Sequence, residues 1–407
     1  MRERALRAIA ECRRIATMTE EPGRITRRFL TPPVHEVHEH LSRRMATMGM
    51  TVRVDAAGNL RGLWQPSNGR EKRFILGSHI DSVPDGGAFD GVLGVALALE
   101  CVELAQEAKL PLAIETIAFS EEEGVRFGVP FIGSRAVAGR FDPALLALRD
   151  AEGVTLEDAI RAFGLDPAGI GEGTLEEGAV GFLEMHIEQG PVLEAEGLSV
   201  AAVTAIMGQT RLSVEFQGRA NHAGTTPMHL RRDALAGAAE WIGAVEAAAR
   251  RTEGLTATVG KIDAAPNAAN VIAGSARVSL DVRHAHDAAR KAAVEALLAQ
   301  AEEIAGRRGL ALQCVRQMDQ PSAPMDDRLT ALLAEAMSAA GFAARTMPSG
   351  AGHDAMVMAA RLPSAMLFLR SPGGVSHHPE ETVRETDVEA ALRVAQKFLE
   401  RVAAAEG

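Results

Sequence analysis

Short apolar runs alternate with a longer helix-patterned segment between residues 73 and 119. The run Arg73–Leu76 precedes a helical segment from about Gly91 to Lys109, and a second apolar run, Ile114–Phe119, follows that segment. This alternation is typical of a largely parallel sheet with helices on its faces. Ligands of such sheets bind beyond the carboxyl ends of the strands. The sequence therefore predicts an α/β fold whose functional residues follow its strands.

The segments on either side of this alternation predict helices and a hairpin. Residues 1–50 have the pattern of two amphipathic helices, and a break is expected near Thr31-Pro32-Pro33. The turn-forming residues Asp55–Asn59 predict a β-hairpin over Thr51–Trp64. An Ala-rich helix is expected to begin near Thr386. These segments extend the α/β domain towards both ends of the chain.

A different order of elements lies between residues 211 and 325. The expected segments are a strand over Arg211–Gly218, a helix over 231–251, strands over Thr256–Ile262 and Ala276–Arg283, a helix over 287–306 and a strand over Leu310–Val315. This β-α-β-β-α-β order is typical of a split βαβ, ferredoxin-like fold. We therefore expect an α+β domain of residues 211–325, inserted between residues 1–210 and 326–407 of the α/β domain.

Composition excludes several classes of function. The net charge of −11 and the lack of a basic cluster argue against nucleic acid as a partner. The three cysteines, Cys12, Cys101 and Cys314, are too few and too far apart for a disulfide framework or a Cys-based zinc site. The first residues lack the apolar stretch of a signal peptide, and no segment has the length and apolarity of a membrane span. We expect an acidic cytoplasmic protein without membrane partners.

The tract Gly77–Ser82 places a histidine and a carboxylate at the end of the first apolar run. Imidazole and carboxylate together suit zinc, manganese, cobalt or nickel. Asp81 follows His79 by two residues, so we expect its carboxylate to accept the second ring N–H of His79 and to fix the tautomer. Taken alone, this pair is equally compatible with a polar contact at a strand end.

Three further tracts deliver similar side chains after apolar segments. They are Ser120–Gly124 with its three glutamates, Met185–Gly190 with His186, and Gly374–Glu381 with His377 and His378. A charge run is most often a solvated face, and a lone histidine is more often structural than a ligand. Four such tracts at predicted strand ends favour a common metal site, in which carboxylates supply a ligand and a general base.

At this point the chain resembles a known family over nearly its whole length. The motifs, in order, are GSHIDSVPDGGAFDG, FSEEEGVRF, MHIEQGPVLE, GQTRLSVEFQGRANHAGTTPM, PNAANVIAG, SLDVRH, SGAGHDAM and GGVSHHPEE. They resemble the group of allantoate amidohydrolases, N-carbamoyl-L-amino-acid hydrolases and β-ureidopropionases, within the aminoacylase-like clan of two-metal hydrolases. One departure is Ala273, where many relatives carry a proline.

The resemblance implies a ligand set for two divalent ions per subunit, either zinc, manganese, cobalt or nickel. One ion would be held by His79, Asp90 and His186, and the other by Asp90, Glu123 and His377, with Asp90 as the bridge. Glu122 would be the general base, since the family pattern places the base before the ligand and the ligand before the glycine. Glu121 would then be a solvated or supporting acid, and His378 a neighbour of the ligand.

The resemblance also implies roles in the inserted domain, which would serve as a dimerisation and lid domain. His222 would reach the active site of the partner subunit in a homodimer and stabilise the oxyanion of the intermediate. Arg283 would bind the substrate carboxylate with the help of Asn270. Gln209 and His353 would form hydrogen bonds to the substrate.

The function implied is hydrolysis of a ureido C–N bond in a small carboxylate substrate. We expect allantoate, with release of ammonia and carbon dioxide, and N-carbamoyl-L-amino-acid hydrolase or β-ureidopropionase activity is the alternative. A dipeptidase or aminoacylase on the same scaffold is disfavoured by His186, where peptidase relatives more often have a carboxylate. A non-catalytic binding protein on this fold is a further alternative, although Glu122 and every expected ligand are present.

Overall fold

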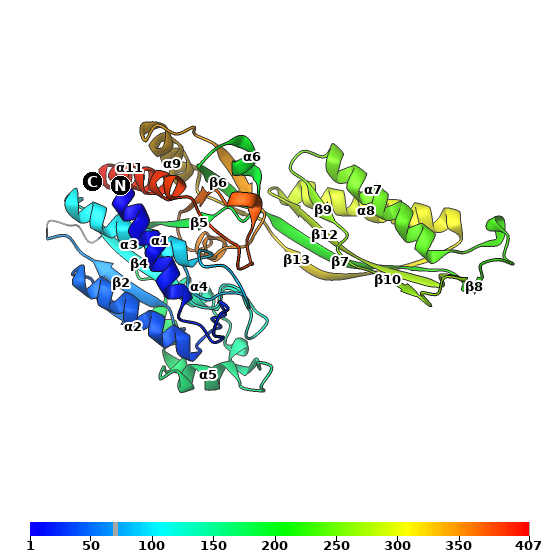
Figure 1. Cartoon of the computed structure of the whole chain (residues 1–407), viewed down its shortest axis with the longest axis horizontal. Helices are drawn as coiled ribbons and strands as arrows, with labels where there is room; N and C mark the ends of the chain where they lie inside the picture. Colours follow the sequence, from blue (N-terminus) through cyan, green and yellow to red (C-terminus); the bar gives the residue numbers. More distant parts are fainter. Residues whose placement is uncertain (68–71, 407) are drawn as a thin grey trace. The chain divides into compact units, whose positions relative to one another are not determined.

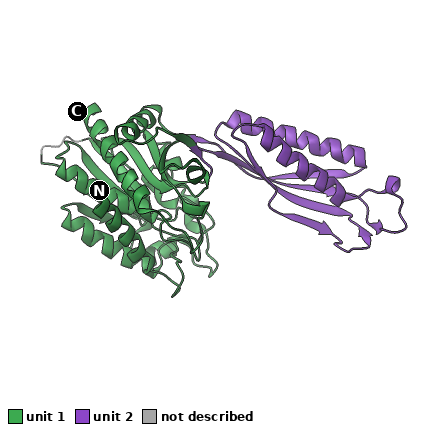
Figure 2. Cartoon of the chain, turned by 45° about the horizontal axis from the view of Figure 1, so that its top comes forward, with its two compact units in different colours: residues 1–204, 324–347, 351–407 green, residues 205–323, 348–350 purple. Residues whose placement is uncertain are grey.

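The computed structural model describes residues 1–67 and 72–406. The chain divides into two compact units (Figure 2). Unit 1 comprises residues 1–204, 324–347 and 351–407, and unit 2 comprises residues 205–323 and 348–350. Unit 2 is therefore inserted into the chain of unit 1. No helix among the residues that the structure describes is long and apolar enough to cross a membrane.

Unit 1 is built on a mixed sheet whose central strands run parallel. The strands are β1 (Thr51–Val54), β2 (Leu60–Trp64), β3 (Arg73–His79), β4 (Ala113–Phe119), β5 (Ala179–Ile187), β6 (Val200–Ile206), β14 (Ala323–Pro324), β15 (Thr346–Ser349) and β16 (Ser364–Leu369). Their order is β1-β2-β4-β3-β5-β16-β6-β14, and β15 pairs with β6. The pairs β4–β3, β3–β5 and β5–β16 are parallel, whereas β1, β2 and β6 pair antiparallel. The predicted α/β class is confirmed.

The main helices of unit 1 are α1 (Arg2–Ala16), α2 (Pro32–Thr47), α3 (Val92–Glu107), α9 (Asp327–Ala339) and α11 (Glu385–Ala405). Four of these helices contact this sheet, and α1 packs on α3 and α11 (Figure 1). Short helices α4 (Ile132–Val137), α5 (Leu156–Ala162), α6 (Val192–Glu196) and α10 (Asp354–Met358) lie in the connections. Almost every residue of α3 is buried, because α3 packs against β3, β5, α1 and α11. A helix that is apolar on all sides is expected at such a central position.

One charge inside α3 is fully buried and compensated. Glu100 is 0% exposed, and its two carboxylate oxygens accept hydrogen bonds from Arg7 and Arg44, with Arg4 as a third donor. An unpaired carboxylate at this depth would be strongly destabilising, whereas a paired and hydrogen-bonded one is tolerated. The arginines of α1 and α2 therefore fix the positions of these two helices on α3.

Unit 2 has the predicted β-α-β-β-α-β order. Its strands are β7 (Gly208–Gln217), β9 (Thr256–Thr258), β10 (Ile262–Ala265), β12 (Ser275–His284) and β13 (Ala311–Gln320), in the antiparallel order β10-β12-β7-β13 with β9 also paired to β12. Helices α7 (Ala234–Arg251) and α8 (Asp287–Arg308) pack on one face. Their core includes Leu212, Val214, Phe216, Trp241, Val278, Leu280 and Leu297. A separate two-stranded sheet joins β8 (Asn221–His222) to β11 (Val271–Ile272).

The strand predicted over Thr256–Ile262 is wrong in one respect, since two short strands occupy this region. β9 and β10 both pair with β12, but Val259–Lys261 between them belongs to neither strand. Here the side-chain oxygen of Ser279 accepts the main-chain N–H of Lys261 at 3.0 Å. A side-chain acceptor and Gly260 therefore interrupt the ladder that the sequence pattern indicated.

Candidate metal centre

The carboxyl ends of the parallel strands bring the predicted ligands of unit 1 together. His79 is the last residue of β3, His186 lies near the end of β5, and the glutamate run follows β4. Because β4, β3 and β5 are parallel neighbours, these side chains converge on one edge of the sheet. His79, Asp90 and His186 have ligand atoms within 4.8 Å of one another, and so do Asp90, Glu123 and His377.

Asp90 lies between these two groups of side chains. Its Oδ1 is 3.4 Å from Nε2 of His79 and 3.2 Å from Nε2 of His186. Its Oδ2 is 3.2 Å from Nε2 of His377. Although burial opposes ionisation, the three histidines hold the pKa of Asp90 well below its ordinary value. Each oxygen of one buried carboxylate thus faces a different set of imidazoles.

Glycine is required directly after Asp90. Gly91 has φ of +64°, and a Cβ at this position would lie 2.5 Å from the ring of His79. A side chain would therefore displace the imidazole as well as strain the backbone. The main-chain N–H of Gly91 also points to Nε2 of His186, at 3.2 Å. The main chain at Gly91 therefore packs directly against the rings of His79 and His186.

The second group includes a buried oxygen that has no partner. Oε1 of Glu123 is buried, forms no hydrogen bond and lies 3.6 Å from Nε2 of His377. Burial and the neighbouring Asp90 raise the pKa of Glu123 to about 7. Buried polar atoms without a hydrogen-bond partner are rare in folded proteins, and an ion-binding site is one ordinary reason for them. The donor set of imidazole and carboxylate fits a divalent transition metal.

The tautomers of the two buried histidines are set by main-chain carbonyls. Nδ1 of His79 lies 3.1 Å from the carbonyl oxygen of Asp81, and Nδ1 of His186 lies 2.9 Å from that of Ile187. Both rings therefore turn Nε2 towards Asp90. The carboxylate of Asp81 is 3.6 Å from Nδ1 of His79, so the expected carboxylate–histidine hydrogen bond is replaced by a carbonyl contact.

The Asp81 carboxylate instead binds the loop that follows β4. Its Oδ1 accepts the main-chain N–H of Glu122 and its Oδ2 accepts that of Glu123, each at 3.0 Å. Burial raises the pKa of Glu122 well above its ordinary value, against the effect of the nearby His79 ring. Glu122, His79 and Glu123 have ligand atoms within 4.8 Å of one another. The two glutamates therefore share one rigidly held loop beside the histidines.

Glu121 is buried, so of the two roles expected for it, a solvated acid is wrong and a supporting acid agrees with its contacts. Its Oε1 accepts the main-chain N–H groups of Arg126 at 3.0 Å and Phe127 at 3.3 Å. The residue is 0% exposed and has φ of +48°. Glu121 therefore closes the loop on itself, while Glu122 and Glu123 face the histidines. His378 carries an exposed ring and accepts the N–H of Glu380, as expected for a neighbour of His377.

His353 and Gln189 complete the surroundings of the site in unit 1. The ring of His353 packs on that of His186, with centroids 4.4 Å apart, and burial lowers its pKa well below the ordinary value. Gln189 was missed by sequence reasoning. Its Nε2 lies 2.9 Å from Oδ2 of Asp90 and 3.3 Å from Nε2 of His377. The only sequence signal was its place three residues after His186 in the motif MHIEQGP.

The remaining predicted residues lie in unit 2, at two ends of its sheet. Arg283 is near the end of β12, opposite Gln209 on β7, whose Nε2 donates to Gln320 at 2.9 Å. His222 and Asn270 lie together beyond the other end, where β8 pairs with β11 and both residues are exposed. Ser275 and Arg283 are eight residues apart on β12, or ~26 Å. Within one chain, Asn270 therefore does not meet Arg283.

The chain is similar to several known proteins over nearly its whole length. The N-carbamoyl-L-amino acid amidohydrolase of Geobacillus stearothermophilus is 38% identical over 91% of this chain and 92% of its own. The allantoate amidohydrolase of Escherichia coli (strain K12) is 35% identical over 94% of this chain and 93% of its own. The structure of a hydantoinase/carbamoylase family amidase from Burkholderia multivorans matches with a TM-score of 0.92 and 30% identity, covering 98% of both chains.

The matches confirm the predicted family and the predicted hydrolase class. The model of peptidase family M20/M25/M40 matches residues 75–401, which include every ligand candidate of unit 1 and the whole of unit 2. The chain therefore belongs to peptidase family M20/M25/M40, whose members are metal-dependent hydrolases.

Proposed function

We propose that the chain hydrolyses the ureido C–N bond of a small carboxylate substrate, releasing ammonia and carbon dioxide, and that allantoate is this substrate. The observation that carries the proposal is the position of Asp90, whose two carboxylate oxygens face two separate sets of ligand groups. The amidohydrolase relatives named for allantoate and for N-carbamoyl-L-amino acids support the same bond type.

Two divalent ions fit the donor groups of unit 1. His79, Asp90 and His186 would hold one, and Asp90, Glu123 and His377 would hold the other, with zinc, manganese, cobalt or nickel as suitable metals. When bound, such a pair lowers the pKa of a shared water towards neutrality and polarises the substrate carbonyl. The unpartnered Oε1 of Glu123 supports a ligand role for this glutamate.

Glu122 is the proposed general base. Its carboxylate accepts the proton of the attacking water and passes it to the leaving nitrogen, so that the nitrogen departs as ammonia. The buried position of Glu122 beside His79 and Glu123 supports this role. Asp81, which binds the main chain of Glu122, keeps the base at a fixed position.

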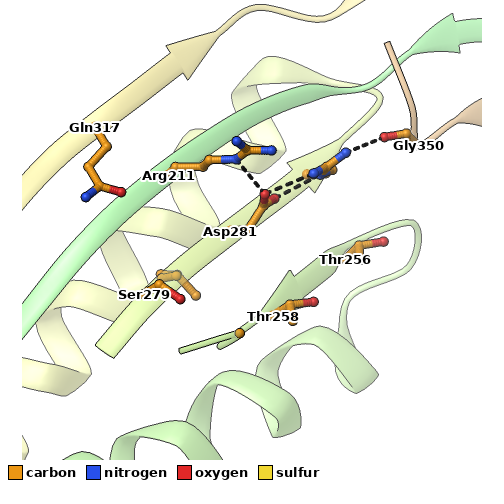
Figure 3. A pocket seen from close by; sticks show the side chains of 10 residues that line it. Arg211, Thr256, Thr258, Ser279, Asp281, Gln317 and Gly350 are labelled. Atoms are coloured by element: carbon orange, nitrogen blue, oxygen red, sulfur yellow. Dashed lines mark hydrogen bonds and ion pairs between the residues drawn. The ribbon is translucent and has the colours of Figure 1, made fainter. Parts of the chain in front are cut away.

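Arg283 is the proposed anchor of the substrate carboxylate, and Gln209 and His353 are proposed to hydrogen-bond the substrate. A guanidinium group matches a carboxylate in a planar, bidentate geometry. Arg283 lines a hollow of about 520 Å³ within unit 2 (Figure 3). None of the residues that line this hollow is aromatic, which disfavours substrates with bulky aromatic side chains.

A homodimer is proposed in which His222 and Asn270 of each subunit serve the active site of the other. Both residues are exposed and adjacent, and Asn270 lies at the opposite end of the unit 2 sheet from Arg283. The proposed pairing of Asn270 with Arg283 on one substrate therefore needs two chains. His222 would donate to the oxyanion that develops on the ureido carbonyl.

N-carbamoyl-L-amino acids are the second candidate substrates, because the relative from Geobacillus stearothermophilus is named for them and shares 38% identity. The deciding experiment measures ammonia release from allantoate and from a panel of N-carbamoyl-L-amino acids. The protein is first freed of metal and then reloaded with Mn²⁺, Zn²⁺, Co²⁺ or Ni²⁺. Higher kcat/KM for allantoate is expected. A higher kcat/KM for a carbamoyl amino acid would show that allantoate is not the preferred substrate. If no combination of metal and substrate released ammonia, the proposed reaction would be wrong.

A further inference from the structure

The face of the unit 2 sheet that the helices leave uncovered carries a cluster of two arginines and one aspartate. Along β12, Leu280 and Val282 point into the core with the helices, so the alternate residues Asp281 and Arg283 point to the other face. Arg211 on β7 lies directly opposite Asp281 in the register. The three side chains therefore meet on one face. Figure 3 labels Arg211 and Asp281 on this face.

Asp281 binds both arginines through its two oxygens. Its Oδ1 accepts Nε of Arg283 at 2.9 Å, and its Oδ2 accepts Nη2 of Arg283 at 3.0 Å. The same Oδ2 also accepts Nε of Arg211 at 2.9 Å. Burial raises the pKa of Asp281, but the two arginines outweigh this effect and lower it. The cluster keeps one net positive charge, which favours an anion in the adjacent hollow.

The contacts of Arg283 leave a specific pair of donors. A guanidinium group has five N–H donors. Asp281 accepts the N–H of Nε and one N–H of Nη2. The main-chain carbonyl of Gly350 accepts one N–H of Nη1 at 2.7 Å. One N–H therefore remains on each Nη nitrogen. Each of these two N–H groups can donate to a substrate oxygen.

Asp281 has two opposite effects on a bound carboxylate, and the balance decides its role. Its negative charge repels a second carboxylate nearby. Its bidentate contact, however, removes the rotamer freedom of Arg283 before any substrate binds, and preorganisation of this kind raises affinity. Arg211 reduces this repulsion, because its positive guanidinium group is hydrogen-bonded to Oδ2 of Asp281. The preorganisation of Arg283 therefore outweighs the repulsion.

We propose that Asp281 is a positioning residue that holds the Arg283 guanidinium with its two free N–H groups available to the substrate carboxylate, and that Arg211 anchors Asp281. The inference rests on the proposed function, in which Arg283 binds that carboxylate. It assigns specificity for acidic substrates to three residues rather than to one. Asp281 itself does not touch the substrate.

The first test compares N-carbamoylglycine with its uncharged carboxamide, using the metal-loaded enzyme. Asp281→Asn is expected to raise KM for the carboxylate about tenfold, as is common for coupled neighbours, with kcat nearly unchanged and no effect on the carboxamide. Glu215→Gln is the matched control, since Glu215 accepts the same kind of pair from Arg277 on the same two strands. An unchanged or lower KM, or equal loss on both substrates, would overturn the inference.

The second test separates this inference from the proposed reaction. In an Arg283→Ala background, Asp281→Asn is expected to raise KM no further, because Asp281 acts only through Arg283. N-acetylglycine binding, followed by calorimetry, needs no turnover. If the wild-type protein binds N-acetylglycine more tightly than Asp281→Asn protein but hydrolyses no ureido compound, the reaction is wrong and the positioning role stands. If ureido compounds are hydrolysed and both proteins bind equally, the positioning role is wrong.

Discussion

Asp81 accepts the main-chain N–H of Glu122 at 3.0 Å, which ties the segment after β3 to the loop after β4. A second oxygen of the same carboxylate accepts the N–H of Glu123. The carbonyl oxygen of Asp81 meets Nδ1 of His79. Asp81 therefore contacts the ring of His79 and holds the main chain of both glutamates.

Replacing Asp81 is expected to disorder the loop that carries Glu122 and Glu123, although no proposed metal ligand is itself replaced. Asp81→Ala removes both acceptors, and we expect metal affinity or kcat to fall by about 10- to 100-fold, as for other supporting residues of metal sites. Metal titration and steady-state kinetics measure the two quantities. Asp326→Asn is the control, since Asp326 accepts a main-chain N–H at the start of α9 instead. Wild-type values for both quantities in Asp81→Ala would contradict this account.

Glu122→Gln tests the proposed base, since it keeps the size of the side chain but removes the proton acceptor. We expect kcat to fall by about 10²- to 10⁴-fold with metal content unchanged, because loss of a general base has this magnitude. Glu121→Gln is the matched control in the same loop. It should remain active because Oε1 of Glu121 accepts loop N–H groups and Glu121 belongs to none of the candidate metal-binding groups. More than about a tenth of wild-type turnover in Glu122→Gln, or 1.4 kcal/mol of barrier, would exclude this base.

His377→Ala tests whether two ions share Asp90. Its Nε2 faces Oδ2 of Asp90, Oε1 of Glu123 and the amide of Gln189, but neither His79 nor His186, so we expect the variant to lose one ion per chain and keep the other. Asp90→Asn is expected to weaken both sites. Elemental analysis after dialysis gives the stoichiometry. His378→Ala is the control because its exposed ring belongs to neither group. Loss of no ion in His377→Ala would exclude His377 as a ligand.

The gathering of the ligand candidates was predictable from the sequence because it follows from strand order. His79, His186 and the glutamate run all end parallel strands, and such ends meet at one edge. Asp90 could not be placed in this way, because it follows eleven residues after His79 in a loop whose path depends on close contacts of Gly91. Its role came from the resemblance, and its position came from the structure.

The expectations that failed depended on contacts distant in sequence. Asp81 was expected to bind its neighbour His79, whereas its carboxylate binds a loop 41 residues later. By contrast, the break expected near Thr31-Pro32-Pro33 depends on local sequence and is confirmed. Pro32 begins α2, where the N–H that proline lacks would have no partner within the helix. Gln189 gave no signal beyond its place in the motif MHIEQGP, because an amide in the left-handed region, with φ of +59°, is placed by the surrounding loops.

The proposed exchange of His222 between subunits can be tested by mixing two inactive variants. Glu122→Gln and His222→Ala proteins are each expected to be nearly inactive. When the two proteins are mixed in equal amounts, dissociated and reassociated, about half of the dimers should be mixed. One of the two sites in each mixed dimer has both Glu122 and His222, so about a quarter of wild-type activity should return. If His222 served its own subunit, no mixed dimer would contain a complete site. Absence of recovery, with mixed dimers verified by mass spectrometry, would therefore contradict the exchange.

Stability at acid pH is expected to depend on His38, a buried histidine of α2 far from the proposed ligands in sequence. Burial and the nearby His35 lower the pKa of His38 to about 4, and its ring packs edge-on against Phe163. The unfolded chain has the ordinary value of 6.5, so it takes up a proton as the pH falls below 6.5 while the folded chain does not. Stability is therefore lost between pH 6.5 and 4, by about 2 kcal/mol at pH 5. Urea unfolding of wild-type and His38→Gln protein at pH 7.5 and 5 measures this loss, and an equal decline in both proteins would show that His38 does not cause it.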